Sequence, residues 1–304
     1  SHFPAVSRVM RIIQHRRLYL SLSAVFVAAA ISVMALFGFR LGIDFTGGSL
    51  VEVSFSSPRP SVDALRRVIE EAGFDPILQP IGSDRVLVRT NKSDEGVKNT
   101  TLVALQRIGE AKVERFSLIG PTISREIARK AAIAVTLALA LIVLYIAFAF
   151  RKVVRPVSSW IYGLATLIAL VHDVVISLGA YAVLGRLLGV EFNTAAIAAV
   201  LTILGFSVHD TIVVFDRTRE NLLKGIGGSF EEVVNASVNQ TMTRSINTSL
   251  TVVLALLAVF LVGGATTKYF ALVLILGIVF GTYSSIFVAS PILVIWERWR
   301  RVMR

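Results

Sequence analysis

A carboxylate lies inside a long apolar stretch of this chain. The stretch runs over residues 192–215, reads FNTAAIAAVLTILGFSVHDTIVVF, and contains His209 and Asp210. It is long enough to cross a bilayer, which takes about 20 mostly apolar residues. A charge at that depth costs roughly 2.5–3.5 kcal/mol, so such a residue usually has a function and a partner. We therefore predict a functional role for Asp210. The alternative is a hydrogen bond to a neighbouring helix or a position at the membrane interface.

Apolar runs of this length recur along the chain. Of its residues, 55% are hydrophobic and the mean hydropathy is +0.73, which is rare among soluble domains. Basic residues give a net charge of +11, and they cluster beside the runs, which indicates orientation and lipid headgroup contact rather than nucleic acid. There is no cysteine, so no disulfide or thiol chemistry is expected. We predict an α-helical integral membrane protein with spans at about 18–38, 131–150, 157–184, 192–215, 239–262 and 270–295.

Residues 39–130 have a different composition from the rest of the chain. They hold 14 Lys and Arg against 12 Asp and Glu, which is typical of a water-exposed domain. Apolar periodicity predicts alternating strands and helices. In order these are strand 50–56, helix 61–72, strands 77–81 and 85–90, a helix from Ser93, and strand 112–119. The β-α-β-β-α-β order predicts an external ferredoxin-like α+β domain.

The distribution of basic residues predicts the orientation of the spans. The N-terminal segment, residues 151–155, residues 217–244 and the C-terminal segment are basic, and a six-span arrangement puts them all on one side. The loops on the opposite side, residues 185–191 and 263–269, contain only two basic residues, Arg186 and Lys268. The positive-inside rule then places both termini, 1–17 and 296–304, in the cytoplasm and the 39–130 domain outside.

Arg244 is the candidate partner of Asp210. The fifth expected span carries a polar stripe of residues spaced by four, namely Asn239, Thr243, Asn247 and Thr251. Arg244 lies on the adjacent stripe of the same helix. Arg244 lies at a depth compatible with Asp210, and an ion pair would offset part of the burial cost. Arginine is effectively always charged whereas aspartate can be neutralised. We therefore predict that Asp210 titrates and Arg244 modulates it in proton transport, the alternative being that Arg244 reaches lipid phosphate.

A second His-Asp dipeptide, His172-Asp173, lies in the third expected span. Aspartate and histidine are common in proton relays, and they also bind metals. A metal site is the weaker interpretation, because neighbouring residues on a helix point about 100° apart and ligands must converge. We expect His172 to be a hydrogen-bonded core histidine. For Asp173, His209 and Asn247 two alternatives stay open, a role in a proton relay and a hydrogen bond between helices.

Small residues follow one face of the sixth expected span. Gly277, Gly281 and Ser285 are spaced by four residues, which favours close helix packing. The chain contains no P-loop and no G-x-S-x-G, H-E-x-x-H or G-x-G-x-x-G motif. We therefore expect no enzyme activity, no metal and no cofactor, and an ion gradient as the source of energy.

Four segments of the chain carry motifs of a known family. LGIDFTGG at 41–48 looks like the signature of the SecD and SecF family, the paired accessory subunits of bacterial protein export, and Gly120-Pro121-Thr122 resembles the element that closes the external domain of this family. GFSVHDTIVVFDRTREN at 205–221 is similar to the fourth-span motif of the SecF branch, in which many members have Asn at the position of His209. TMTRSINT at 241–248 resembles the start of its fifth span.

The resemblance implies a fold, partners and site residues. It implies half of an arrangement like that of the RND exporters, in the bacterial inner membrane, driven by the proton motive force. The implied partners are SecD, the SecYEG translocon, the exported polypeptide and, further, YajC and YidC, beside membrane lipids. The aspartate and arginine implicated in proton transport fall on Asp210 and Arg244. The turn residues Asp44, Thr46, Gly47 and Gly48 would connect membrane and domain, the alternative being an ordinary structural turn.

Two other functions compete with protein export. One is half of an RND-type proton-coupled exporter of small molecules or lipids, for which about 92 external residues leave little room. The other is a structural subunit in which the charged residues only fix the register of the helices.

Overall fold

The computed structural model describes residues 10–151 and 156–303, except for the side chains of residues 265 and 266. Four basic residues used in the orientation prediction lie outside the described residues: Arg8, Lys152, Arg155 and Arg304. The chain forms two compact units. We name them the helical unit, Ser1–Gly38, Val135–Val183 and Ile197–Arg304, and the sheet unit, Phe39–Ala134 and Leu184–Ala196.

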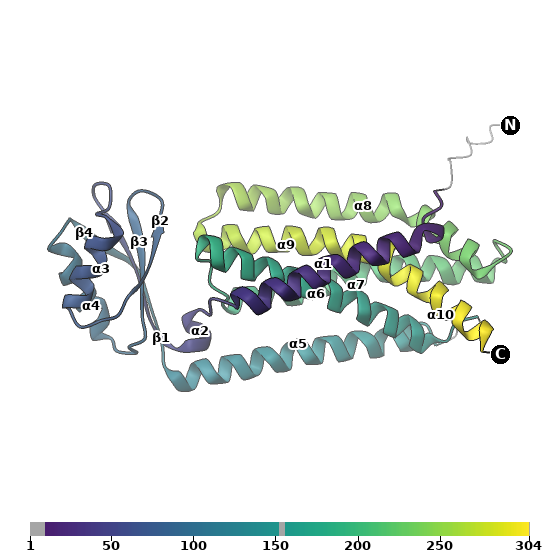
Figure 1. Cartoon of the computed structure of the whole chain (residues 1–304), viewed down its shortest axis with the longest axis horizontal. Coiled ribbons are helices and arrows are strands. Elements are labelled where there is room, and N and C mark those ends of the chain that lie inside the picture. Colours follow the sequence, from purple (N-terminus) through teal and green to yellow (C-terminus); the bar gives the residue numbers. More distant parts are fainter. Residues whose placement is uncertain (1–9, 152–155, 304) are drawn as a thin grey trace. The chain divides into compact units, whose positions relative to one another are not determined.

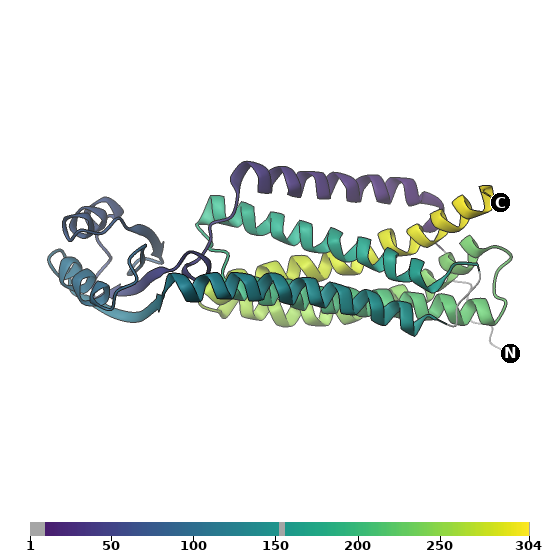
Figure 2. The same cartoon turned by 90° about the horizontal axis from the view of Figure 1, so that it is seen from below.

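Long helices dominate the chain (Figures 1 and 2), and in the part of the chain that the structure describes six helical segments are long and apolar enough to span a membrane, the last of them made of α9, a π turn and α10. The predicted six-span membrane fold is thus confirmed. The helices are α1 (Arg16–Phe37, after the 3₁₀ turn η1, Ile13–His15), α5 (Pro121–Ala149), α6 (Ser159–Leu188), α7 (Thr194–Leu223), α8 (Phe230–Val262), α9 (Ala265–Ser284) and α10 (Ser290–Val302), with a π-helical turn η2 (Ser285–Ala289) between the last two.

The helix ends extend beyond the spans expected from the apolar runs. The helix α8 begins at Phe230, well before residue 239, because Ser229 and Glu232 form a capping box that starts the helix in a polar segment. At the other end of the chain, α9, the π turn and α10 together form one span, Thr267–Val302. Polar residues can extend a helix once it is nucleated, so hydropathy alone underestimates its length.

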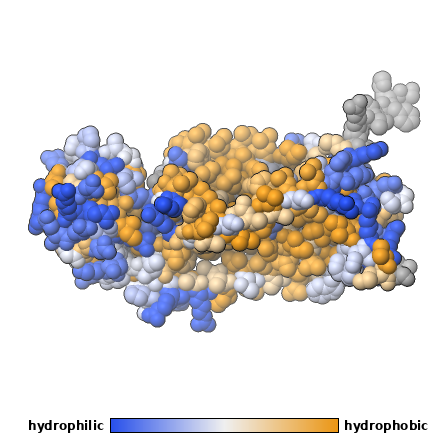
Figure 3. All heavy atoms as spheres, viewed as in Figure 1, coloured by the Kyte–Doolittle hydropathy of each residue, from blue (hydrophilic) through white to orange (hydrophobic). Residues whose placement is uncertain are grey.

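Burial divides the spans into two groups. About half of the most apolar window is buried in α6, in α7 and in the last span, at 50%, 50% and 56%, against 11%, 11% and 6% in α1, α5 and α8. The three peripheral helices present apolar side chains outward, and the face of the bundle in Figure 3 is accordingly almost entirely apolar. The central helices α6, α7 and α9 are therefore where a polar group is best shielded from lipid.

The domain at the start of the sheet unit has the predicted β-α-β-β-α-β order. Its elements are α2 (Ile43–Thr46), β1 (Gly48–Phe55), α3 (Val62–Glu71), β2 (Ile77–Ile81), β3 (Arg85–Thr90), α4 (Gly96–Gln106) and β4 (Ala111–Ile119). The strands pair antiparallel in the order β2-β3-β1-β4. The apolar faces of β1 and β3 pack against Leu65 and Ile69 of α3 and Leu105 of α4, so both helices cover one face (Figure 1). The predicted α+β fold is confirmed.

Candidate functional site

Two glycines bring α9 close to α7 in the helical unit. A Cβ atom at Gly277 would lie 2.2 Å from Ile203, and one at Gly281 would lie 3.1 Å from the Cβ of Ser207. Larger residues would therefore separate the two helices. The close approach lets short hydroxyl side chains of α9 reach carboxylates on the neighbouring helices.

Asp210 of α7 is buried and accepts hydrogen bonds from hydroxyl groups. Only 4% of the residue is exposed. Its Oδ2 accepts from the Oγ1 of Thr282 on α9 at 2.8 Å and from the Oγ of Ser249 on α8 at 3.3 Å. The two hydroxyl groups lie 2.5 Å apart. One carboxylate thus joins three helices, and its hydroxyl partners stabilise its charge.

His209 lies beside this carboxylate but not inside the site. Its Nδ1 is 3.7 Å from Asp210 Oδ1, and 57% of its side chain is exposed. That distance is too long for a hydrogen bond. The structure therefore places the two residues of this dipeptide in different surroundings, as their angular separation on a helix predicts.

Arg244 does not meet Asp210 in this structure. None of the ion pairs among residues 10–151 and 156–303 joins the two, and Arg244 is exposed. The α8 residue that reaches Asp210 is Ser249, five positions later and therefore about 140° around the helix. The expected ion pair between Asp210 and Arg244 is therefore not formed in this structure. The argument from sequence compared the depths of the two residues, but rotation about α8 decides which side chain faces α7. The role of both residues in proton transport stays a prediction.

The expected polar stripe of α8 faces away from the Asp210 site. Thr243, Asn247 and Thr251 are exposed, and the Oγ1 of Thr251 donates to the backbone oxygen of Asn247 at 2.8 Å. A hydroxyl that bonds one turn back in its own helix needs no partner from another helix. Asn247 thus takes no place beside Asp210, and its predicted relay or bonding role stays a prediction.

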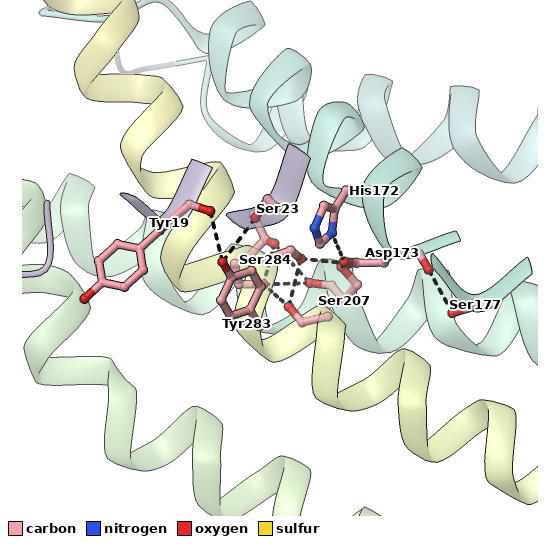
Figure 4. A network of polar contacts seen from close by, with 11 residues as sticks. Tyr19, Ser23, His172, Asp173, Ser177, Ser207, Tyr283 and Ser284 are labelled. Carbon is pink, nitrogen blue, oxygen red and sulfur yellow. Dashed lines mark hydrogen bonds and ion pairs between the residues drawn. The ribbon is translucent and has the colours of Figure 1, made fainter. Parts of the chain in front are cut away.

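Asp173 of α6 is the centre of a second buried network (Figure 4). The residue has no exposed surface. Its Oδ2 accepts from the Oγ of Ser207 on α7 at 2.6 Å and from the Oγ of Ser284 on α9 at 2.7 Å. Its Oδ1 lies 2.8 Å from Nδ1 of His172. Every oxygen of this carboxylate therefore has a partner, which is what burial of a charge in a membrane requires.

His172 has one bonded and one unbonded ring nitrogen. Its Nδ1 contacts Asp173, whereas its buried Nε2 has no hydrogen-bond partner among the described residues. The ring stacks on Tyr283 with centroids 6.2 Å apart. The Tyr283 hydroxyl donates to the backbone oxygen of Tyr19 at 3.1 Å and accepts from Ser23 at 3.2 Å (Figure 4). The network thus extends from α6 to α1.

Ser285 at the start of the π turn lies between the two carboxylate networks. Its Oγ is 2.8 Å from the Oγ1 of Thr211, the residue after Asp210, and it follows Ser284, which binds Asp173. A π turn within a helix is frequent at functional sites. The hydroxyl residues Ser207, Ser249, Thr282 and Ser284 were missed as site residues, because serine and threonine in spans commonly bond only neighbouring helices. The described part of the chain holds no group of three or more His, Cys, Asp and Glu side chains suited to a metal ion.

The turn after α1 contacts the start of α7 within the sheet unit. Asp44 Oδ2 accepts from the backbone nitrogen of Thr194 at 2.7 Å and from its hydroxyl at 2.6 Å. Gly47 and Gly48 have φ of +72° and +117°, and a Cβ at Gly48 would lie 2.3 Å from the backbone oxygen of Thr90. Only glycine fits that position. Thr46 accepts a hydrogen bond from Arg89 of β3 at 2.9 Å.

Comparison with known proteins identifies the family. Residues 32–58 match the SecD/SecF GG motif, and residues 100–299 match the C-terminal part of the protein export membrane protein SecD/SecF. The chain belongs to the SecD/SecF family. The resemblance inferred from the sequence is thus confirmed. Within this family match lie the turn at residues 44–48, Asp210 and Asp173, and the hydroxyl residues that bind the two carboxylates.

Other members of the SecD/SecF family are similar along nearly the whole chain. The protein translocase subunit SecF of Thermobaculum terrenum is 41% identical over 305 residues, covering 94% of this chain and 93% of that protein. SecDF of Thermus thermophilus is 37% identical over 92% of this chain but only 38% of its own length. The crystal structure of that organism's SecDF matches with a TM-score of 0.85 and 35% identity, over 98% of this chain and 40% of the solved chain. The chain is a multi-pass membrane protein.

Proposed function

We propose that this chain works as the SecF part of a SecD–SecF complex that couples the proton motive force to the movement of exported polypeptides through or away from the Sec translocon. Family membership and relatives named protein translocase subunits support the role in export. The coupling to protons rests on one observation, the buried carboxylate of Asp210 held by hydroxyl groups between α7, α8 and α9. The part of SecDF that this chain does not span supports SecD as the partner.

Protonation of Asp210 would change the hydrogen bonds that join the three helices. The carboxylate only accepts, and Thr282 and Ser249 donate to it. A protonated carboxyl group carries its proton on one oxygen; a proton on Oδ2 would displace one hydroxyl, whereas a proton on Oδ1 leaves Oδ2 as a neutral acceptor for both. The charge-assisted bonds then become neutral bonds of roughly half the strength. The neutral group keeps the observed packing, because it has no charge for Arg244 to pair with, whereas the deprotonated group favours a different packing of α7 against α8 and α9.

Arg244 would act in the second state. It lies on an exposed face of α8 in this structure, and a charge at membrane depth is costly without a partner. A rotation of α8 about its axis by about 140°, together with the reach of the long arginine side chain over roughly 7.5 Å along the axis, would bring the Arg244 guanidinium group beside Asp210. In this scheme the deprotonated Asp210 attracts Arg244, and the protonated one releases it, so that proton binding alternates the two packings of α8.

We place both termini in the cytoplasm and the domain formed by residues 39–130 outside. Support comes from the cluster in which Glu231 at the start of α8 binds Arg16 of α1 at 3.1 Å and also Arg298 of α10. This cluster brings the described ends of the chain to the same end of the helical unit. Exported chains would then emerge on the side of the sheet domain. SecYEG, and further YajC and YidC, are the proposed neighbours.

The test uses Asp210→Asn in a complex with SecD, reconstituted beside the translocon in vesicles. Asparagine keeps the shape but carries no titrating proton. We expect the part of export that depends on the proton gradient to disappear, while export without a gradient is unchanged. Asp216→Asn is the matched control, because Asp216 lies on the same helix, is exposed and pairs with Arg219 at 2.7 Å. Gradient-dependent export that persists in Asp210→Asn overturns the proposed coupling.

A further inference from the structure

The loop between α6 and α7 belongs to the sheet unit and not to the helical unit. Backbone pairing attaches it to the segment that follows α1. Phe192 donates its N–H to the oxygen of Arg40 at 2.7 Å, and Gly42 donates its N–H to the oxygen of Phe192 at 2.8 Å, which forms a parallel bridge. The rings of Phe39 and Phe45 pack on Phe192, with centroids 5.1 and 5.9 Å away. The first residues of α7 thus belong to the same compact unit as the sheet.

Arg89 connects the sheet itself to this loop. Its Nη1 binds Glu191 Oε1 at 3.1 Å and the backbone oxygen of Leu41 at 2.6 Å, while its Nη2 binds Thr46 at 2.9 Å. One guanidinium group on β3 therefore contacts the loop before α7 and the turn after α1. Only 14% of the Arg89 side chain and 17% of the Glu191 side chain are exposed.

The other ion pairs of the sheet unit differ from Arg89–Glu191 in their exposure and in the segments that they join. Within the described residues, the pairs Arg66–Glu70, Arg85–Glu52, Lys112–Glu114 and Lys130–Glu126 each have a basic side chain that is 45% to 80% exposed. Exposed pairs of this kind contribute little to stability. Each also joins residues of the domain or of one helix to each other. Arg89–Glu191 differs in both respects, because it is shielded and joins the domain to the α6–α7 loop.

Asp44 makes a second connection to α7. Its carboxylate accepts from the N–H and the hydroxyl of Thr194 at 2.7 and 2.6 Å, so it satisfies a free donor in the first turn of the helix. A carboxylate is favourable there because the helix dipole is positive at its start. The helix then continues without interruption to Leu223 and carries Asp210 about 24 Å further along.

We propose that Arg89 and Glu191, together with the Asp44–Thr194 contact, are the positioning residues that transmit movement between the proton-binding helix α7 and the external sheet domain. The inference rests on the proposed function, because it assumes that the packing of α7 changes with the proton state of Asp210. It adds a route for the coupling. The covalent route runs through α1 and α5, which flank the domain in the chain, whereas the Arg89–Glu191 link joins the domain to the helix that carries Asp210.

A rigid connection is required for such transmission, and the link has the properties of one. A single helix carries displacement along its axis, and the link fixes the start of that helix to a strand of a four-stranded sheet. The guanidinium group has a fixed planar geometry with donors on three sides, and it here holds three acceptors at once. Removing it would leave Glu191 buried without its cation, and the loop would separate from β3 to hydrate the carboxylate.

The test measures the connection and the export activity separately. Variants Arg89→Met and Glu191→Ala would be examined as the full chain with SecD in lipid. We expect amide hydrogen exchange at Gly42, Phe192 and Thr194 to become about tenfold faster in Arg89→Met and several-fold faster in Glu191→Ala, because their bonded N–H groups open more often. We expect gradient-dependent export to fall by a similar factor, with gradient-independent export unchanged. Glu191→Ala keeps the experiment interpretable if Arg89→Met does not fold, since Arg89 retains its bonds to Leu41 and Thr46.

The matched control is Arg85→Met. Arg85 lies on the same strand and binds Glu52 at 3.1 Å, inside the domain. We expect wild-type exchange around Thr194 and wild-type export. Faster exchange at Thr194 with normal gradient-dependent export in the Arg89 and Glu191 variants would overturn the proposal, because the link would then be only structural. Unchanged exchange would overturn it as well. If Asp210→Asn loses gradient-dependent export but Arg89→Met and Glu191→Ala do not, the link is rejected and the proposed function stands. Normal export in Asp210→Asn rejects the proposed function itself.

Discussion

The Oγ1 of Thr282 donates a 2.8 Å hydrogen bond to Oδ2 of Asp210, from the last turn of α9 to the middle of α7. This bond connects the proposed proton-binding group to a span that packs closely against α7, since a Cβ atom at Gly277 on α9 would overlap Ile203 of α7. The Ser249 hydroxyl of α8 completes the site at 3.3 Å. One carboxyl group therefore joins three spans, and under the proposed function its proton state selects their packing.

Replacement of Thr282 by valine tests this relationship. Valine has nearly the same shape but lacks the hydroxyl, so the carboxylate loses its shorter bond. A hydrogen bond to a charged group contributes about 1.5–3 kcal/mol, and we expect gradient-dependent export to fall by roughly tenfold or more. Thr202→Val is the control, since Thr202 is exposed on α7 and donates to the backbone oxygen of Ala198. Equal export by both variants would show that Thr282 does not support Asp210.

Asp173 is predicted to hold helices together and not to carry protons. Asp173→Ala leaves the Ser207 hydroxyl and one imidazole nitrogen without their acceptor, and each such loss costs about 1–3 kcal/mol, whereas the Ser284 hydroxyl keeps the backbone oxygen of Gly281 at 3.1 Å. Asp173→Asn is milder, because His172 can move its proton to Nε2 and then accept from the amide. We expect a large fall in thermal stability in detergent for alanine and a small one for asparagine. A stable Asp173→Asn protein without gradient-dependent export would show instead that Asp173 is part of a proton relay.

Gly277→Ala tests the close approach of α9 to α7. The added Cβ would lie 2.2 Å from Ile203, so the helices must move apart, and overpacking of this kind costs about 1–3 kcal/mol. We expect a lower unfolding temperature, partly restored by adding Ile203→Ala, which removes the overlapping atoms. Gly205→Ala is the control, because nothing lies within 4 Å of a Cβ at that position of α7. Because alanine has the higher helix propensity, the control is expected to keep or raise the unfolding temperature, and a similar loss in the control would show that the contact with Ile203 is not the cause.

Glu191 gives the Arg89–Glu191 link a pH dependence. Burial raises the pKa of the Glu191 carboxyl above its ordinary 4.5, Arg89 of β3 and Arg40 before α2 lower it, and Asp44 of α2 raises it. Because the raised pKa belongs to the closed link, the closed form binds the proton more tightly than an open, hydrated form. The link is therefore most stable below pH 4.5 and weakens as the pH rises through the raised pKa.

Glu191→Gln tests the sign of this effect. Glutamine resembles the protonated carboxyl group and still accepts from Arg89. We expect amide exchange at Thr194, corrected for the intrinsic effect of pH, to accelerate with rising pH in the wild type and to stay slow in Glu191→Gln. Acceleration on acidification of the wild type would contradict the prediction, since it would mean that the ion pair outweighs the cost of burial.

Sequence alone determined the architecture, because the patterns that specify it are local. Apolar runs of span length identify membrane helices without reference to the rest of the chain. Apolar periodicity in the segments that form β1, α3 and β3 and the order of the elements identified the sheet domain. The cost of a carboxylate in an apolar run was sufficient to select Asp210, since that cost depends on its immediate neighbours in the chain and on the membrane.

Only the tertiary structure decided which groups meet. Position along a helix gives the depth of a residue, but each residue also turns the side chain by about 100°, and the rotation of a span is set by packing against distant helices. Arg244 has a depth compatible with Asp210 and yet lies on an exposed face, while Ser249 and Thr282 hold the carboxylate. Arg89 and Glu191 are about 100 residues apart and come together only when the α6–α7 loop pairs with the segment after α1. Contacts of that kind depend on the folded chain as a whole, and local sequence does not encode them.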